Sequence, residues 1–275
     1  MRKLGVILLV ALLSISSALA DMEVVFLDVG QADAAVVICD DQVLMIDGGN
    51  VDDSQFIYSY LANTKGIQHI DFMVSTHPHE DHVGGLSAAL NACSVGAVLS
   101  PVTYYESVPF ENFLKYVHRQ EIEITQPEHG YSFNLGTAVV TIVSDPHEEF
   151  GSNDKSIILR IDYGSTSFLF TGDAEWAAES AAIESGANLS VTVMKVGHHG
   201  SDTSTSEPFL AAVAPKYAVI SVGENNDYGH PAELTLNRLK AAGVMVYRTD
   251  LYGTIVCTSD GETITFTAEK SPRRR

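Results

Sequence analysis

Cysteine is scarce in this chain, and its three cysteines follow neither a metal-binding nor a disulfide pattern. Cys39, Cys93 and Cys257 lie far apart, whereas zinc ribbons and disulfide scaffolds use closely spaced pairs. Three thiols also leave at least one unpaired within a monomer. Because Cys39 and Cys257 lie in apolar, strand-like runs, we expect them to be small buried hydrophobic residues, without a chemical role.

Basic residues are also few. The chain has 16 lysines and arginines against 35 aspartates and glutamates, a formal net charge of −19. Such a surface repels polyanions at long range, although salt screens the repulsion beyond about 10 Å. The acidic balance argues against long DNA as a substrate without excluding it, because a local metal site could still hold one phosphodiester.

A long apolar run occurs only at the N-terminus. Arg2 and Lys3 precede an apolar core from Leu4 to Leu13, and Ala18-Leu19-Ala20 resembles a cleavage site. This pattern predicts a signal peptide at residues 1–20, since the core is too short to span a bilayer as a mature helix. A retained membrane anchor is the alternative, and no cysteine follows the cleavage site as in a lipoprotein.

The predicted organisation is a signal peptide (1–20), one domain (21–270) and a basic tail (271–275). The mature protein is expected to be secreted, with 14 basic residues against 35 acidic ones and a net charge near −21. The rest of the sequence has no apolar run long enough to predict a transmembrane helix, so a transmembrane channel is not expected from this chain.

Alternating strand-like and helix-like segments predict an α/β fold. The expected strands are 24–28, 35–39, 43–46, 72–75, 138–144, 157–161, 167–170, 191–195, 217–221, 243–247, 254–258 and 263–267. The expected helices are 54–63, 86–91, 110–118, 174–185, 207–213 and 232–242, with Asp173 and Gly186 as start and stop of the fourth. Two sheets packed face to face, with helices outside, would satisfy this order.

Metal-binding residue types are concentrated in His77-Pro78-His79-Glu80-Asp81-His82. Alternate residues of an extended loop point the same way, so His77 and His79 can bind one ion while Asp81 and His82 face a second. Imidazole nitrogen and carboxylate oxygen suit zinc and similar metals. Gly84 and Gly85 follow, and we interpret them as allowing a tight backbone turn into a helix.

This HxHxDHxGG pattern resembles the signature of the metallo-β-lactamase superfamily. Six other segments resemble its ComEC-like subgroup: Leu27–Ala34 (LDVGQADA), Ile46–Gly49, Asn153–Ser156, Thr171–Asp173, Lys195–Ser201 (KVGHHGS) and Tyr228–Pro231 (YGHP). The resemblance covers about 23–266. It implies an αββα sandwich of two mixed β-sheets flanked by helices, with a site on loops at one sheet edge that holds two divalent ions, zinc or manganese.

The resemblance also implies roles for residues that follow the six-residue segment His77–His82, called the hexad below. Asp173 would bridge the two ions, although an aspartate here is also a good helix N-cap. One of His198 and His199 would complete the second site. Because adjacent residues on an extended segment point opposite ways, only one should reach the metal; we favour His199, with His198 near the substrate.

Many superfamily members have a third histidine for the first ion between the hexad and the bridging aspartate. None of His118, His129 and His147 lies in the expected sequence context. The matching segment contains Asn153 and Ser156, so the first ion is expected to bind less tightly. Asn153 is a candidate weak ligand or phosphate donor.

The remaining candidates support the ligands or contact the substrate. Asp47 suits a carboxylate that orients a ligand imidazole, with a turn residue as the alternative; Asp33 is a similar candidate. His230 is the candidate for contacting a phosphate or protonating a leaving oxygen. Asp81 could orient the attacking water, and Ser201 could contact phosphoryl oxygens.

These residues predict an exported metal-dependent hydrolase, with a phosphodiester in nucleic acid or a cell-envelope polymer as substrate. A hydrolase of a lactam, lactone or thioester is one alternative. A non-catalytic, metal-stabilised cell-envelope binding protein is the other.

Overall fold

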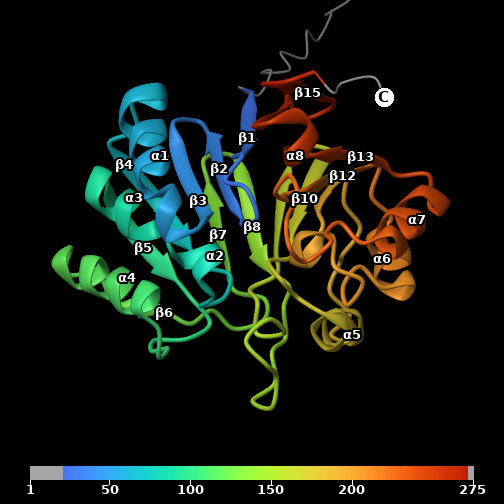
Figure 1. Cartoon of the computed structure of the whole chain (residues 1–275), viewed down its shortest axis with the longest axis horizontal. Helices are drawn as coiled ribbons and strands as arrows, with labels where there is room; N and C mark the ends of the chain where they lie inside the picture. Colours follow the sequence, from blue (N-terminus) through green and yellow to red (C-terminus); the bar gives the residue numbers. More distant parts are fainter. Residues whose placement is uncertain (1–20, 272–275) are drawn as a thin grey trace, which may run out of the picture.

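The computed structural model describes residues 21–271, and the predicted signal peptide and all but the first residue of the basic tail lie outside them. Two mixed sheets face each other, with helices on both outer faces (Figure 1). This is the predicted αββα sandwich. None of the helices within residues 21–271 is long and apolar enough to cross a membrane.

The first sheet has eight strands and is antiparallel at one end and parallel at the other. Its order is β15 (Ile264–Ala268), β14 (Ile255–Ser259), β1 (Met22–Phe26), β2 (Ala34–Cys39), β3 (Gln42–Gly48), β4 (His69–Val74), β5 (Ser94–Leu99) and β6 (Ile124–Thr125). The second sheet has seven strands: β13 (Met245–Arg248), β12 (Tyr217–Ile220), β11 (Val193–Lys195), β10 (Thr166–Phe170), β9 (Leu159–Tyr163), β8 (Ala138–Ile142) and β7 (Ser132–Leu135).

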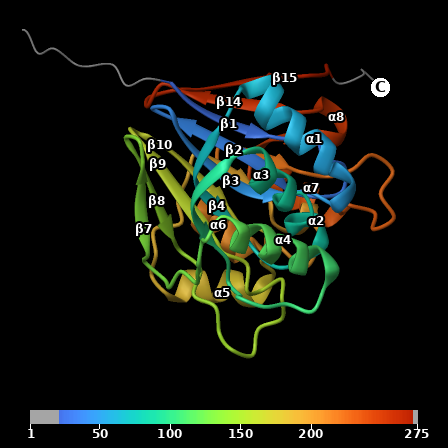
Figure 2. The same ribbon diagram turned by 90° about the vertical axis from the view of Figure 1, so that its left-hand side faces the viewer.

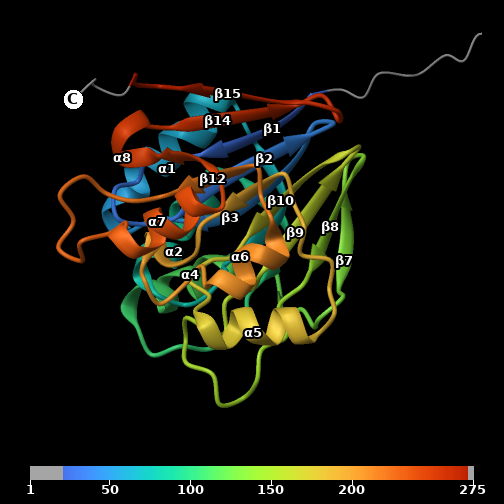
Figure 3. The same ribbon diagram turned by 90° about the vertical axis from the view of Figure 1, so that its right-hand side faces the viewer.

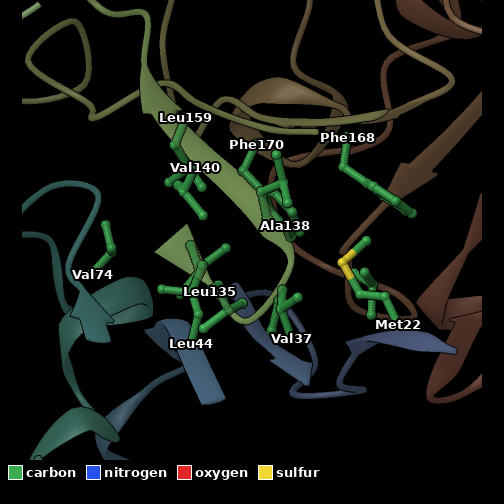
Figure 4. Packing of buried hydrophobic residues seen from close by; sticks show 14 of the residues in the cluster. Met22, Val37, Leu44, Val74, Leu135, Ala138, Val140, Leu159, Phe168 and Phe170 are labelled. Carbon is green, nitrogen blue, oxygen red and sulfur yellow. The ribbon is translucent and has the colours of Figure 1, made fainter. Parts of the chain in front are cut away.

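Three apolar layers hold the sandwich together. The central one lies between the sheets, where side chains such as Leu44, Val140 and Phe170 are buried (Figure 4). Alternate residues of each strand face this layer, and the others face the outer helices. Cys39 and Cys257 are buried members of the central layer, and all three cysteines are free, as expected.

Helices of the N-terminal half cover the first sheet (Figure 2), and those of the C-terminal half cover the second (Figure 3). The first group is α1 (Ser54–Ser59), continued by a π-helical segment Tyr60–Lys65, α2 (Glu80–Val83), α3 (Leu86–Ala92) and α4 (Val108–Arg119). The second is α5 (Trp176–Glu184), α6 (Glu207–Val213) and α7 (Glu233–Ala241), while α8 (Thr249–Tyr252) follows β13 and its Tyr252 packs against the central layer.

Helix α4 shows how the local sequence sets these elements. Ser107 accepts a hydrogen bond from the Phe110 amide at the helix start, the usual role of an N-cap serine. Phe110, Phe113 and Val117 recur at helical spacing and are all buried against the first sheet.

Most predicted strands and helices are present within two or three residues, but β5, β6, β7, α2 and α8 were missed. Four of them are only two to four residues long, so their sequence signal is small, whereas the six-residue β5 (SVGAVL) carries an apolar signal that was overlooked. The start of α5 was also predicted too early. Asp173 lies in the preceding loop, and the N-cap position is occupied by Glu175. Gly186, with a φ of 75°, follows the end of this helix as predicted.

The interpretation of Gly84 and Gly85 was wrong. Their φ angles are −55° and −83°, which any residue can adopt. Glycine is needed at both positions because the backbone packs closely there. A Cβ at Gly85 would lie 2.1 Å from the Gly48 carbonyl oxygen, and one at Gly84 would lie 2.4 Å from the Val51 nitrogen. Side chains are excluded where α2 and α3 cross the end of β3.

Candidate metal centre

The candidate site residues gather where β3, β4, β10 and β11 end. Asp47 lies near the end of β3, and His77 follows β4. Asp173 follows β10, and the two adjacent histidines follow β11. Since β3 and β4 are parallel, and so are β10 and β11, these ends meet along one edge of the sandwich.

Four residues bring one potential ligand atom each within 4.8 Å of one another: Asp81, His82, Asp173 and His199. Asp81 Oδ2 is 3.2 Å from His199 Nε2. Asp173 Oδ1 is 3.2 Å from His82 Nε2, and its Oδ2 is 3.6 Å from His199 Nε2. The two halves of the chain therefore contribute equally to this cluster.

The donor set fits a metal ion. His82 Nε2 and Asp173 Oδ1 are buried 3.2 Å apart, and neither makes a hydrogen bond within the described residues. Buried polar atoms are seldom left without a partner, and a cation between them would satisfy both. Two imidazole nitrogens and two carboxylates are also ligands that zinc accepts.

His77 and His79 lie beside this cluster. His77 Nε2 is 3.1 Å from His79 Nδ1 and 3.9 Å from Asp173 Oδ2. Asp173 thus has Oδ1 near His82, while its Oδ2 lies between His199 and His77. Whether one ion or two bind remains a prediction.

No third histidine joins His77 and His79 within residues 21–271. The described metal-ligand groups include none of His118, His129 and His147, which are all exposed. In the corresponding place, Ser156 Oγ accepts a hydrogen bond from the Asp173 amide at 3.1 Å. Asn153 Nδ2 is 3.4 Å from Glu175 Oε1, and its Oδ1 is buried without a partner.

Asp47 holds His82 from behind. Its Oδ2 is 2.8 Å from His82 Nδ1, and both carboxylate oxygens accept hydrogen bonds from Thr76, from the amide and from the hydroxyl, each at 2.7 Å. An imidazole fixed in this way presents Nε2 to the site. Burial raises the pKa of Asp47, and the charge of His82 only partly offsets this.

The imidazoles of the site fall into two groups by the direction in which their surroundings shift the pKa. Burial lowers the pKa of His77 and His79, and the charge of His82 lowers both further. Burial also acts on His199, but the carboxylates of Asp173 and Asp33 outweigh it and raise the pKa of His199 to about 10. The pKa of His82 is likewise raised despite burial, mainly by Asp173 and Asp47.

The expectation that His198 and His199 lie on an extended segment was wrong. Both are left-handed, with φ angles of 47° and 52°, in a short turn. Both rings consequently approach Asp173, since His198 Nε2 is 3.7 Å from its Oδ2. Only His199 belongs to the four-residue cluster; His198 Nδ1 is 3.0 Å from Glu175 Oε1.

The substrate-side candidates lie around this turn. The half-buried His230 has its ring centre 5.6 Å from that of His198, and its Nδ1 is 3.4 Å from Gln31 Nε2. Ser201 instead bonds within its own turn, 3.0 Å from the Thr203 hydroxyl.

Sequence reasoning gave no role to two charged residues of the site. Glu175 contacts His198, Thr203 and Asn153. Lys195 is buried beside Asp33. A lysine inside the apolar run Val193–Val196 was a usable signal, because lysine is rarely buried without a partner.

Comparison with known proteins relates the chain to a family. The profile of the metallo-beta-lactamase superfamily matches residues 27–224. ComE operon protein 3 of Bacillus subtilis strain 168 is 30% identical over 251 residues, 85% of this chain and 32% of that protein. Competence protein ComA of Neisseria gonorrhoeae is 32% identical over 229 residues, 83% of this chain and 31% of that protein. The chain thus spans about a third of the length of these relatives.

Solved structures share the architecture at low sequence identity. YhfI from Bacillus subtilis, a metallo-beta-lactamase fold protein, superposes with a TM-score of 0.58 at 12% identity, over 87% of this chain and 100% of that one. Igni18, a metallo hydrolase from Ignicoccus hospitalis, gives 0.52 at 14% identity, over 91% and 100%. These likenesses concern the fold alone. Because the profile matches most of its length, the chain belongs to the metallo-β-lactamase superfamily and is distantly related to ComEC-like competence proteins.

Proposed function

We propose that this protein is a metal-dependent hydrolase that cleaves phosphodiesters. The observation that carries the proposal is the convergence of Asp81, His82, Asp173 and His199, with two buried ligand atoms that lack partners. Such a cluster is costly to bury and has no evident structural purpose without a cation.

The chain's own residues would divide the work. Asp81, His82, Asp173 and His199 would hold one ion, and His77, His79 and Asp173 the other. When bound, the ions would supply an activated water and positive charge that stabilises a phosphoryl group. Asp81, the most exposed of the first four, is placed to orient the attacking water. His230 and His198 would face the substrate.

One feature favours a phosphodiester over a lactam, lactone or thioester. The place of the third histidine is taken by Asn153 and Ser156, which leaves polar donors near the first ion.

Nucleic acid is the phosphodiester we favour. One relative is named Competence protein ComA, another ComE operon protein 3, and a third Recombination protein 2. The acidic composition argues for short or single-stranded pieces rather than long duplexes. Export through cleavage after Ala20 stays part of the proposal, and mass spectrometry of secreted protein would show a mature N-terminus at Asp21.

The test combines metal analysis with a substrate panel. We expect the purified protein, reconstituted with Zn²⁺ or Mn²⁺, to bind two ions of unequal affinity and to hydrolyse bis(p-nitrophenyl) phosphate but not a chromogenic β-lactam. Asp173→Ala should lose metal and activity together, because the remaining ligands cannot hold both ions close.

Asp52→Ala removes an exposed carboxylate outside the cluster and serves as the matched control. A protein that binds no transition metal after reconstitution would refute the proposal. Stoichiometric metal without hydrolysis of any diester would instead indicate the binding protein.

A further inference from the structure

Lys195 ends β11 and lies beneath the candidate ligands. By strand alternation its side chain points the same way as that of Val193, into the layer between the sheets. Among the lysines and arginines of the described residues, only Lys195 and Arg160 are buried. The Lys195 ammonium contacts Asp33 Oδ2 and donates a hydrogen bond to the Gly172 carbonyl oxygen at 3.2 Å.

Asp33 lies between two ligand histidines. Its Oδ1 is 3.3 Å from His199 Nδ1, whereas its Oδ2 is 3.8 Å from His82 Nδ1. His82 already has a closer carboxylate in Asp47. The ammonium group binds the oxygen of Asp33 that faces His82 and leaves the other to face His199. His82 is thus bonded to Asp47, whereas His199 Nδ1 bonds the Ser221 carbonyl oxygen at 3.0 Å with Asp33 Oδ1 close beside it.

The second contact of Lys195 reaches the loop that carries Asp173. Gly172 precedes this aspartate and has a φ of 51°. A Cβ there would lie 2.8 Å from Thr76 Oγ1 and 2.9 Å from Ser156 Oγ, so the loop is already tightly enclosed. The Gly172 carbonyl oxygen already accepts a hydrogen bond from the His198 amide at 3.2 Å, and the ammonium is its second donor, which links the loop after β10 to β11 below the site.

Stability alone is a poor reason for this arrangement. Burying an ion pair costs desolvation that its attraction barely repays, and apolar replacements are often neutral or stabilising. The cavity beside the ammonium measures only about 10 Å³, room for roughly one water. An unbranched apolar side chain such as methionine would fill nearly the same space as lysine.

We propose that Lys195 is a positioning residue of the metal site. It holds Asp33 so that its carboxylate stays against the His199 ring, beside the Ser221 carbonyl oxygen that Nδ1 bonds, and it holds the Gly172 carbonyl so that Asp173 faces the same ion. The inference rests on the proposed metal binding and extends it to a residue that touches neither metal nor substrate.

The test measures Zn²⁺ affinity by competition with a chelator, independently of activity. Lys195→Met should weaken binding of one ion by about 10- to 100-fold, the usual effect of losing a group that orients a ligand. The absorption spectrum of the Co²⁺-loaded variant should also change, because it reports ligand geometry. Lys216→Met removes an exposed lysine next to β12 and should leave both measurements unchanged.

A double-mutant cycle with Asp33→Asn separates positioning from general destabilisation. If Lys195 acts largely through Asp33, the loss of Zn²⁺ affinity in the double variant should exceed that of Asp33→Asn only by the share of the Gly172 contact, and should stay well below the sum of the two single losses. The double variant also leaves no unpaired buried charge, so it carries the test if Lys195→Met does not fold.

Three outcomes would overturn the inference: wild-type affinity in Lys195→Met, wild-type affinity in the double variant, or additive losses in the cycle. A wild-type protein that binds no Zn²⁺ would instead refute the proposed function.

Discussion

Single side chains of the site work in pairs, one facing the ion and one behind it. His82 is held by Asp47, and His199 by Asp33 and by the Ser221 carbonyl oxygen at 3.0 Å. A buried acceptor behind each ring selects which nitrogen faces the site. The geometry of the centre is therefore set as much by these buried partners as by the ligands.

His230 offers a residue-scale prediction because it borders the site without joining the metal-ligand group. His230→Ala should keep its metal while slowing hydrolysis of a diester with a poor leaving group, by 10²–10⁴ for a lost general acid. An ester of nitrophenol, whose leaving group needs less protonation, should be slowed less. The measurement is kcat on both substrates alongside metal content.

The control is His118→Ala, which removes an exposed histidine of α4. Equal slowing of both substrates would indicate that His230 positions the phosphate instead. Loss of metal would show that His230 is a ligand and that the choice of His199 needs revision.

The ligand candidates could be found from sequence because they lie in short motifs with recognisable spacing. The residues that hold these ligands in place could not be identified from the sequence in the same way. Lys195 and Glu175 act through contacts between the two halves of the chain or across a loop, and spacing along one segment does not encode such contacts. The conformation of His198 and His199 was missed for a similar reason, since left-handed backbone is rare outside glycine.

Helix packing against strand ends decides whether the site can form, and the glycines after His82 show this at the scale of elements. Gly85→Ala would place a methyl group against the Gly48 carbonyl oxygen. Overpacking against backbone typically costs about 1–3 kcal/mol or more. We expect Gly85→Ala to lower the thermal unfolding midpoint strongly and to weaken metal binding, because α2 carries Asp81 and His82.

Gly151→Ala is the matched control, because a Cβ at Gly151 has no neighbour within 4 Å. A Gly85→Ala protein as stable as Gly151→Ala would contradict the packing argument. Here the sequence indicated that glycine was needed, but not whether turning or close approach required it.

Helices α5 and α6 are joined by a buried carboxylate. Glu179 of α5 accepts hydrogen bonds from the amides of Thr205 and Ser206. Burial raises its pKa from 4.5 to about 7, which these hydrogen bonds only partly oppose. Because the folded-state pKa is raised, the group adds nothing below pH 4.5, and its ionisation costs stability as pH rises from there to about 7.

This pKa shift predicts a loss of roughly 3 kcal/mol from Glu179 between pH 4.5 and about 7, as an order of magnitude. Glu179→Gln should remove that part of the pH dependence, whereas Glu184→Gln, at an exposed position of the same helix, should retain it. Denaturant midpoints at several pH values measure this. Parallel wild-type and Glu179→Gln curves would show that Glu179 does not titrate in this range.

The whole molecule brings two sheets together so that parallel strand ends from both meet at one edge. This architecture could be predicted because the strands and helices alternate with clear apolar periods. Strand order was beyond the sequence pattern: β14 and β15, from the end of the chain, pair beside β1 in the first sheet. That pairing joins residues more than two hundred positions apart, which no local pattern specifies.

The overall charge gives the prediction that belongs to this scale. A protein of net charge −19 should repel long polyanions, and salt should weaken the repulsion. Raising ionic strength from about 10 mM to 150 mM should therefore increase kcat/KM for a long single-stranded oligonucleotide, while leaving that for bis(p-nitrophenyl) phosphate nearly unchanged. Proteins that bind nucleic acid through basic grooves show the reverse dependence, because counterion release weakens with salt. A fall in kcat/KM for the oligonucleotide would mean that local basic side chains, such as Lys155 and Arg238, bind its phosphates although the protein as a whole is acidic. In that case Lys155→Gln should make kcat/KM fall less steeply with salt.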